Sequence, residues 1–172
     1  MKKFINLLAA AVLVTALGFS ASAQSPKLGH IDSSKILEAL PERSSMEKEL
    51  QSYYTELQSQ LQTMATEYQN KVQEYEAQSA TMSNLVRQSK EKEILDLQNR
   101  IQEFQQNAEA AFEQKRADLL KPLIEKIQNA VNTVGKEKGF TYIFDIATGA
   151  TVYIGDNAVD ITDMVKAKLG IK

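Results

Sequence analysis

Apolar residues in the middle of the chain recur at helical spacing and predict two long helices. From Met46 to Tyr75 they are three or four positions apart, in a pattern that repeats every eleven residues. Eleven residues in three turns is about 3.67 residues per turn, which is typical of a nearly straight helix with a narrow apolar stripe. This first stripe consists of Met46, Leu50, Tyr53, Leu57, Leu61, Met64, Tyr68, Val72 and Tyr75.

A second stripe with the same spacing follows a polar stretch. Because the polar residues 78–92 separate the two stripes, we expect an antiparallel helical hairpin with its tip between Ser79 and Ser89. At about 1.5 Å per residue, limbs of about 35 to 40 residues make an arm about 50 to 60 Å long. The second stripe consists of Ile94, Leu97, Ile101, Phe104, Ala108 and Ala111, and resumes as Leu119, Leu123, Ile127, Ala130 and Val134.

Composition separates this arm from a small body. Residues 42–121 contain no glycine and no proline but thirteen glutamines, whereas residues 122–172 hold five of the seven glycines. The sequence therefore predicts an arm over 42–121 and a body built from residues 24–41 and 122–172. The expected fold class is α+β, with a long antiparallel helical hairpin, a coiled-coil arm, projecting from a small β-rich body.

The N-terminal part of the body contains clear start and stop signals. We expect a strand over 28–31 and a short helix over 33–39 that Asp32 caps. Pro41 ends that helix and fits the first turn of the long helix. Pro122 lies inside the apolar pattern of the returning helix and predicts a bend.

The C-terminal part of the body has strand character. We expect the returning helix to end over 136–139, with lysines in its last turn and Gly139 beyond it, and residues 140–146 and 150–154 to form a β-hairpin around Ala-Thr-Gly. Asp160 is expected to cap a last helix over 161–169. Exposed sheet edges are usually covered, so we expect the bodies of several copies to assemble. The candidate oligomerisation residues are Phe144, Ile146, Val152 and Ile154.

The first 23 residues have the pattern of a secretory signal peptide. Lys2 and Lys3 precede an almost wholly apolar run over 4–19, and Ala21-Ser22-Ala23 is a small-residue cleavage site. We therefore expect cleavage after Ala23 and an exported mature chain, with an uncleaved N-terminal anchor as the alternative. The chain has no cysteine, so its stability comes from packing or assembly and not from disulfides.

The charge balance is mildly acidic. The signal peptide holds two lysines and no acid, so the mature chain is more acidic than the whole-chain net charge of −2. This argues against a dedicated nucleic-acid binder. Residues 42–121 carry ten Lys or Arg and fourteen Asp or Glu. The basic residues near the expected tip are interrupted by Glu91 and Glu93, which favours a solvated face with ion pairs over a lipid or lipopolysaccharide site.

Residues for catalysis or metal binding are scarce. Carboxylates two residues apart on a helix, such as Glu47 and Glu49, point away from each other. His30 is the only histidine and there is no cysteine, so a transition-metal site is not expected. We expect no enzyme activity and no cofactor, and we assign His30 a structural or exposed role on its strand.

Several motifs together resemble the Skp/OmpH family of periplasmic chaperones. They are "GHIDSSKILEALPE", a glutamine-rich helical hairpin without cysteine, "LLKPLIEKIQNAVNTVGKEKGFTYIFD" and a closing "VDITDMVKAKL". The resemblance covers essentially the whole mature chain. The first motif and the order of the two C-terminal motifs are the most specific parts, because long helical arms occur in many unrelated proteins.

The resemblance implies a homotrimer. In this family three bodies join their strands into a small β-barrel, and three arms enclose a cavity that holds unfolded outer-membrane proteins without ATP or a cofactor. The chain departs from the best-known members in one respect, because their arms are basic and its arm is acidic overall. Membrane contact is therefore not carried over from the family.

Candidate client-contact residues are apolar residues that lie off the two stripes or near the tip. They are Tyr54, Met82, Leu85, Val86 and Leu95. The alternative is that Tyr54 and Leu95 widen the contact between the two helices. A competing function is a structural spacer or adaptor of the cell envelope, which binds a folded partner through the arm tips and ignores unfolded chains.

Overall fold

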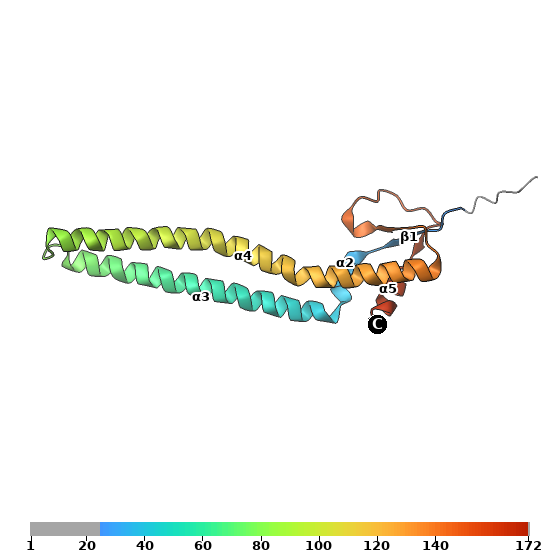
Figure 1. Ribbon diagram of the computed structural model, residues 1–172, viewed down its shortest axis with the longest axis horizontal. Coiled ribbons are helices and arrows are strands. Elements are labelled where there is room, and N and C mark those ends of the chain that lie inside the picture. Colours follow the sequence, from blue (N-terminus) through green and yellow to red (C-terminus); the bar gives the residue numbers. More distant parts are fainter. Residues whose placement is uncertain (1–24, 172) are drawn as a thin grey trace, which may run out of the picture.

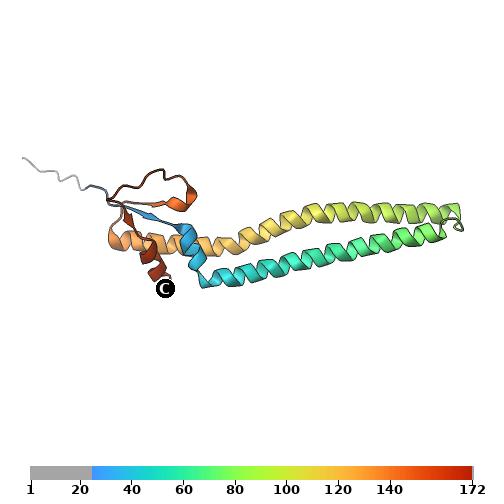
Figure 2. The same ribbon diagram turned by 180° about the vertical axis from the view of Figure 1, so that it is seen from behind.

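The chain forms a long two-helix arm that projects from a small body (Figures 1 and 2). The computed structural model describes residues 25–171, so the expected signal peptide over 1–23 lies outside the described residues. Helix α3 spans Pro41–Gln78 and helix α4 spans Asn84–Lys138. The connection over 79–83 lies inside the expected tip region, and the predicted fold class is confirmed.

The body contains a three-stranded parallel sheet in the order β2-β1-β3. Strand β1 lies in the middle, where Leu28 is opposite Tyr142 of β2 and Gly29 is opposite Val159 of β3. The body elements are β1 (Leu28–Ile31), α2 (Ser33–Ala39), β2 (Tyr142–Asp145), the 3-10 helix η1 (Ile146–Thr148), β3 (Val159–Asp160) and α5 (Thr162–Lys168).

The expected hairpin between 140–146 and 150–154 is wrong. Strand β2 ends at Asp145, whose carboxylate accepts a hydrogen bond from the N–H of Ala147 at 3.0 Å and starts η1. Gly149 then adopts a left-handed conformation with φ 72°. The chain continues through 150–158 without regular structure and reaches the other side of β1, where β3 pairs. The Ala-Thr-Gly segment therefore follows the end of β2 but does not lead into an antiparallel strand beside it.

Most predicted helix ends are confirmed. The carboxylate of Asp32 accepts from the N–H of Lys35 at 3.1 Å, Pro41 is the first residue of α3, and Gly139 follows α4 with φ 69°. Asp160 lies one residue before the N-cap of α5, but its carboxylate accepts from the N–H of Thr162 at 2.8 Å.

Helix α4 runs continuously through Pro122. Figure 1 shows it changing direction in the yellow part of the ribbon, before the orange stretch. The direction change fits the predicted bend, because proline removes one backbone hydrogen bond of the helix.

The two arm helices pack along the predicted stripes. Every residue of both stripes is buried or half-buried, although α3 has no fully buried residue. Several ion pairs join the helices, some near the tip and others nearer the body. Lys71 pairs with Glu93 at 3.1 Å near the tip, and Lys115 pairs with Glu49 at 2.6 Å nearer the body. The arm is therefore a single seam with charged contacts on its sides.

The core of the body lies between the sheet and α4. Ile36 of α2 and Ile161 and Val165 next to or in α5 are the largest fully buried side chains. They pack with α4 residues from Leu123 onward. Because the same helix forms a limb of the arm and a wall of this core, the direction of the arm is set by packing in the body.

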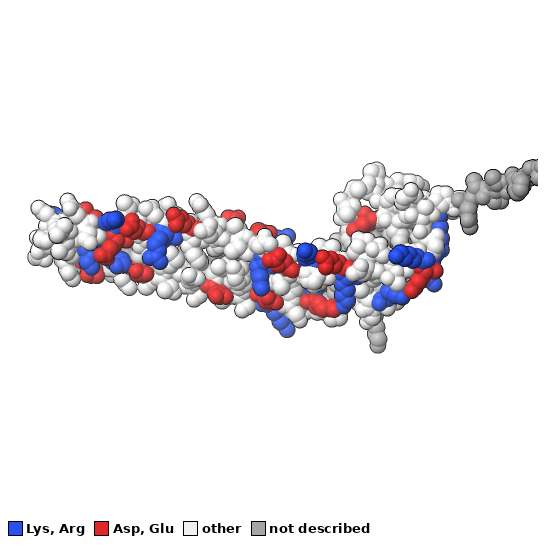
Figure 3. All heavy atoms as spheres, in the orientation of Figure 1, with Lys and Arg blue, Asp and Glu red and all other residues white. Residues whose placement is uncertain are grey.

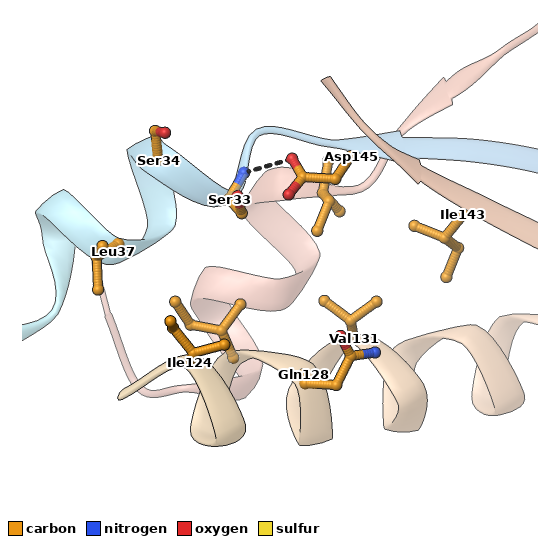
Figure 4. A pocket seen from close by; sticks show the side chains of 10 residues that line it. Ser33, Ser34, Leu37, Ile124, Gln128, Val131, Ile143 and Asp145 are labelled. Carbon is orange, nitrogen blue, oxygen red and sulfur yellow. Dashed lines mark hydrogen bonds between the residues drawn. The ribbon is translucent and has the colours of Figure 1, made fainter. Parts of the chain in front are cut away.

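Side-chain hydrogen bonds connect the N-terminal motif to the two C-terminal motifs. The carboxylate of Asp145 accepts from the N–H of Ser33 at 3.2 Å (Figure 4), and the hydroxyl of Thr162 accepts from the N–H of Asp32 at 3.0 Å. Both contacts satisfy backbone donors at the start of α2. The residues that made these motifs distinctive therefore hold the body together.

Candidate functional site

Among the described residues, no strand pairs with the outer edge of β2, and this strand carries aromatic side chains. Tyr142 and Phe144 lie on the same face with ring centroids 6.3 Å apart and rings inclined by 28°. Phe144 is 49% exposed. An unpaired strand edge beside exposed aromatic rings is a surface that another chain can cover.

The predicted oligomerisation residues lie on this strand and in the loop that follows it. Phe144, Val152 and Ile154 are exposed, and Val152 is 97% exposed. Ile146 is half-buried at the start of η1. Residues 150–154 form no strand, so Val152 and Ile154 lie on a loop and not on the predicted second strand. Their role in assembly stays a prediction.

The tip of the arm exposes apolar side chains. Ser83 caps α4 by accepting from the N–H of Val86 at 3.4 Å. Leu85 is 78% exposed, Val86 is exposed and Met82 is half-buried. Leu95 is exposed on α4, next to the half-buried seam residue Ile94. Contact of these residues with a client stays a prediction.

A groove lies between the arm helices about midway along α3. It has a volume of about 250 Å³ and is lined mainly by Tyr54, Leu57, Leu61, Phe104, Ala108 and Phe112. The rings of Tyr54 and Phe112 meet edge to face, with centroids 5.8 Å apart and an angle of 70°. Tyr54 thus widens the seam, as the alternative supposed, and is still 46% exposed. We call this feature the mid-arm groove.

Phe112 is a groove residue that the sequence pattern missed. It follows Ala111 directly, so it lies beside the second stripe and not on it. Large aromatic residues next to a helical stripe extend the apolar face to one side. The aromatic residues directly beside the two stripes, Tyr54 and Phe112, were therefore the available sequence signal for a widened seam, and the structure shows that they meet.

The body contains a second hollow, which is next to the start of α2 (Figure 4). It has a volume of about 320 Å³, and its lining includes Ser33, Leu37, Ile124, Gln128 and Ile143. Its acidic group, Asp145, accepts hydrogen bonds from the N–H groups of Ser33 and Ala147. One oxygen of that carboxylate, Oδ1, accepts both bonds and so connects the starts of α2 and η1.

His30 lies on a strand, as expected, and the structure makes this strand, β1, the middle one of the sheet. Its Nε2 is 3.8 Å from a carboxylate oxygen of Asp160 on β3, and its buried Nδ1 has no hydrogen-bond partner among the described residues. Partial burial works to raise the pKa of Asp160, but hydrogen bonds from Thr162 and the nearby His30 outweigh it and lower that pKa. The pair is part of the sheet packing.

Two further properties concern the described residues alone. Within residues 25–171, no three His, Cys, Asp or Glu side chains come together in a way that could hold a metal ion. In the same part of the chain, no helix is long and apolar enough to cross a membrane.

Comparison with known proteins identifies relatives over nearly the whole chain. Residues 27–169 match the family model described as outer membrane protein (OmpH-like). A chaperone protein Skp from Pectobacterium atrosepticum is 30% identical over 168 residues, which are 96% of this chain and 98% of that protein. The protein of the same description from Photorhabdus luminescens is 29% identical over 91% of this chain and 94% of its own length.

A solved structure shares the fold. It is described as a putative outer membrane chaperone (OmpH-like) from Caulobacter crescentus, and it superposes with a TM-score of 0.70. The match covers 84% of this chain and 83% of that chain, at 16% sequence identity. At this identity the likeness supports the arm-and-body architecture alone.

Proposed function

The chain belongs to the OmpH-like family, and from this membership we propose that it is a chaperone of outer-membrane proteins, a non-enzymatic holdase that works without ATP. We further propose that it works in the periplasm as a homotrimer. Three bodies join through their open sheet edges, and three arms surround a space in which one unfolded client is held.

The observation that best supports this proposal is the long arm on a small body. Helix α3 has 38 residues, which at about 1.5 Å each is about 57 Å of helix. A single seam buries little, and the body adds only a small core. Elements of this length project far beyond the core that anchors them, which suits a surface that encloses another molecule.

The mechanism follows from weak and repeated contacts. Unfolded membrane-barrel strands expose alternating apolar side chains and unpaired backbone groups, and both promote aggregation. Exposed apolar residues spread along an arm bind such strands one at a time, and the enclosing arms keep clients apart. Each contact is weak, so the client leaves without an energy source when a better site, such as an assembled barrel, is available.

The test is a dilution assay. A urea-unfolded outer-membrane barrel protein is diluted into buffer with or without the purified mature chain, without ATP, and light scattering is followed. We expect suppressed scattering that saturates near one client per three chains. Unchanged scattering with several unrelated barrel proteins would refute the holdase and would favour an envelope spacer that binds a folded partner.

Assembly is tested separately by Phe144→Asp. A carboxylate at this exposed aromatic position would be desolvated in a joined sheet, so we expect the molecular mass from light scattering after size-exclusion chromatography to fall from three protomers to one. Asn157→Asp is the matched control, because it adds one negative charge at an exposed residue of the same body and should leave three protomers. A wild-type chain that is monomeric at micromolar concentration would refute the trimer.

A further inference from the structure

The mid-arm groove is an open apolar site. Its walls come from both arm helices, and none of its apolar side chains is fully buried. Pockets for drug-sized ligands are about 300 to 1,000 Å³, so a groove of about 250 Å³ suits a single side chain. The aromatic rings of Tyr54, Phe104 and Phe112 on its walls favour an aromatic or branched aliphatic side chain.

The groove lies in a section of the arm that has acidic residues but no basic ones. This section, residues 50–70 of α3 and 101–112 of α4, contains Glu56, Glu67, Glu103 and Glu109 and neither lysine nor arginine; Arg100 directly precedes its α4 part. Glu109 lines the groove itself. We call it the acidic section of the arm.

These glutamates are not neutralised by neighbours. Among the described residues, none of the four forms an ion pair, whereas the arm on either side of the section is joined by pairs such as Lys90 with Glu74 and Lys115 with Glu49. On the face drawn in Figure 3, the blue spheres of the arm gather near the tip and near the body, and the surface between them is white and red. The groove therefore lies in a local negative field.

We infer that the mid-arm groove selects client segments in which an apolar side chain, above all an aromatic one, has lysine or arginine beside it. This inference rests on the proposed holdase function and adds a substrate class to it. The apolar side chain fills the groove while the neighbouring cation lies near Glu109, the glutamate that lines it. The attraction between the glutamate and the cation acts within a Debye length of about 8 to 10 Å at physiological salt. Only charged residues close to the bound side chain therefore affect binding.

The test uses the intact mature chain and three labelled, unstructured peptides of equal length. The first has a central phenylalanine flanked by lysines, the second has the same phenylalanine flanked by glutamates, and the third keeps the lysines but replaces phenylalanine with serine. Fluorescence anisotropy gives the dissociation constants. We expect the first peptide to bind about fivefold to tenfold more tightly than the second, with a preference that shrinks as salt rises. The third should bind weakly, since it cannot fill the groove.

Variants separate charge from shape. Glu109→Gln should remove most of the preference for lysine over glutamate, whereas the controls Glu76→Gln and Glu125→Gln should keep it. Glu76 and Glu125 are exposed glutamates outside the acidic section. Ala108→Leu places a larger side chain in the groove, and leucine is itself a good helix former. This variant should bind both phenylalanine peptides more weakly while its helix content stays the same.

The outcomes separate this inference from the proposed function. Equal or tighter binding of the glutamate-flanked peptide, or unchanged affinities in Ala108→Leu, would overturn the groove assignment even if scattering is suppressed. A change in the number of protomers in Ala108→Leu would assign the groove to a second copy of the chain and overturn it as well. Lysine preference in a chain that fails to suppress scattering would keep the groove and refute the holdase.

Discussion

Gly29 in the central strand β1 allows the body to close, and its replacement by alanine should destabilise the protein. The added Cβ would lie 2.8 Å from Cε1 and 3.0 Å from Cδ1 of Phe140, and 3.3 Å from the backbone oxygen of Val159. Ordinary contacts begin at 3.4 Å, so the Phe140 ring must move by more than half an ångström. The Val159 oxygen belongs to β3, which pairs with β1 through only two residues.

The magnitude follows from these contacts. Overpacking at a filled site costs about 1 to 3 kcal/mol. The ring of Phe140 also lies 4.3 Å from the Nζ of Lys27, and moving it weakens a cation–π contact of about 0.5 kcal/mol. We therefore expect Gly29→Ala to lower the free energy of unfolding by about 2 kcal/mol.

The assay is urea unfolding followed by far-UV circular dichroism. Gly155→Ala is the matched control, because its Cβ would lie 3.6 Å from the nearest atom of Tyr153, and we expect a change within about 0.5 kcal/mol. In the double variant Gly29→Ala with Phe140→Leu, the free energy of unfolding should fall by less than the sum of the two single losses, with a coupling energy of about 1 kcal/mol. A midpoint for Gly29→Ala equal to that of the wild type, or strict additivity, would refute the steric argument.

Two further predictions concern the body and the base of the arm. Thr162→Val removes the hydroxyl that accepts from the N–H of Asp32, so urea unfolding should show a loss of about 1 to 3 kcal/mol; a neutral result would show that this bond contributes nothing. The hydrogen bond from Lys126 lowers the pKa of Glu42 below 4.5, so the pair stabilises the arm above that pH and its contribution disappears as pH falls through the folded pKa. The Tm difference between wild type and Glu42→Gln should therefore be present at neutral pH and vanish in acid, and a difference that persists in acid would contradict the assignment.

The sequence predicted the arm well because its information is local. A stripe such as Leu57, Leu61 and Met64 fixes both the helix and the face that packs, and Pro41 and Gly139 mark helix ends through backbone geometry alone. None of these inferences needs knowledge of a distant residue. Helices with one apolar face can therefore be predicted from a single sequence.

The sheet was less predictable because its pairing is not local. The segments 142–145 and 159–160 both pair with β1, and no pattern inside 140–160 distinguishes this arrangement from a hairpin. The mid-arm groove was missed for a related reason. Its edge is the contact between Tyr54 and Phe112, which depends on how two helices align across the seam.

The parallel sheet also sets the order in which the chain completes its structure. Strand β1 is near the N-terminus, yet both of its neighbours follow after the whole arm. It therefore has no partner strand until β2 is available, and the sheet is complete only with Asp160. Joining ends this far apart carries a large loop-closure entropy and a high contact order. A formed helical hairpin removes most of that separation, because its two limbs return the chain to the start of α2. The arm therefore helps the body to fold, because it brings β1 and its partner strands close together, in addition to projecting from the body.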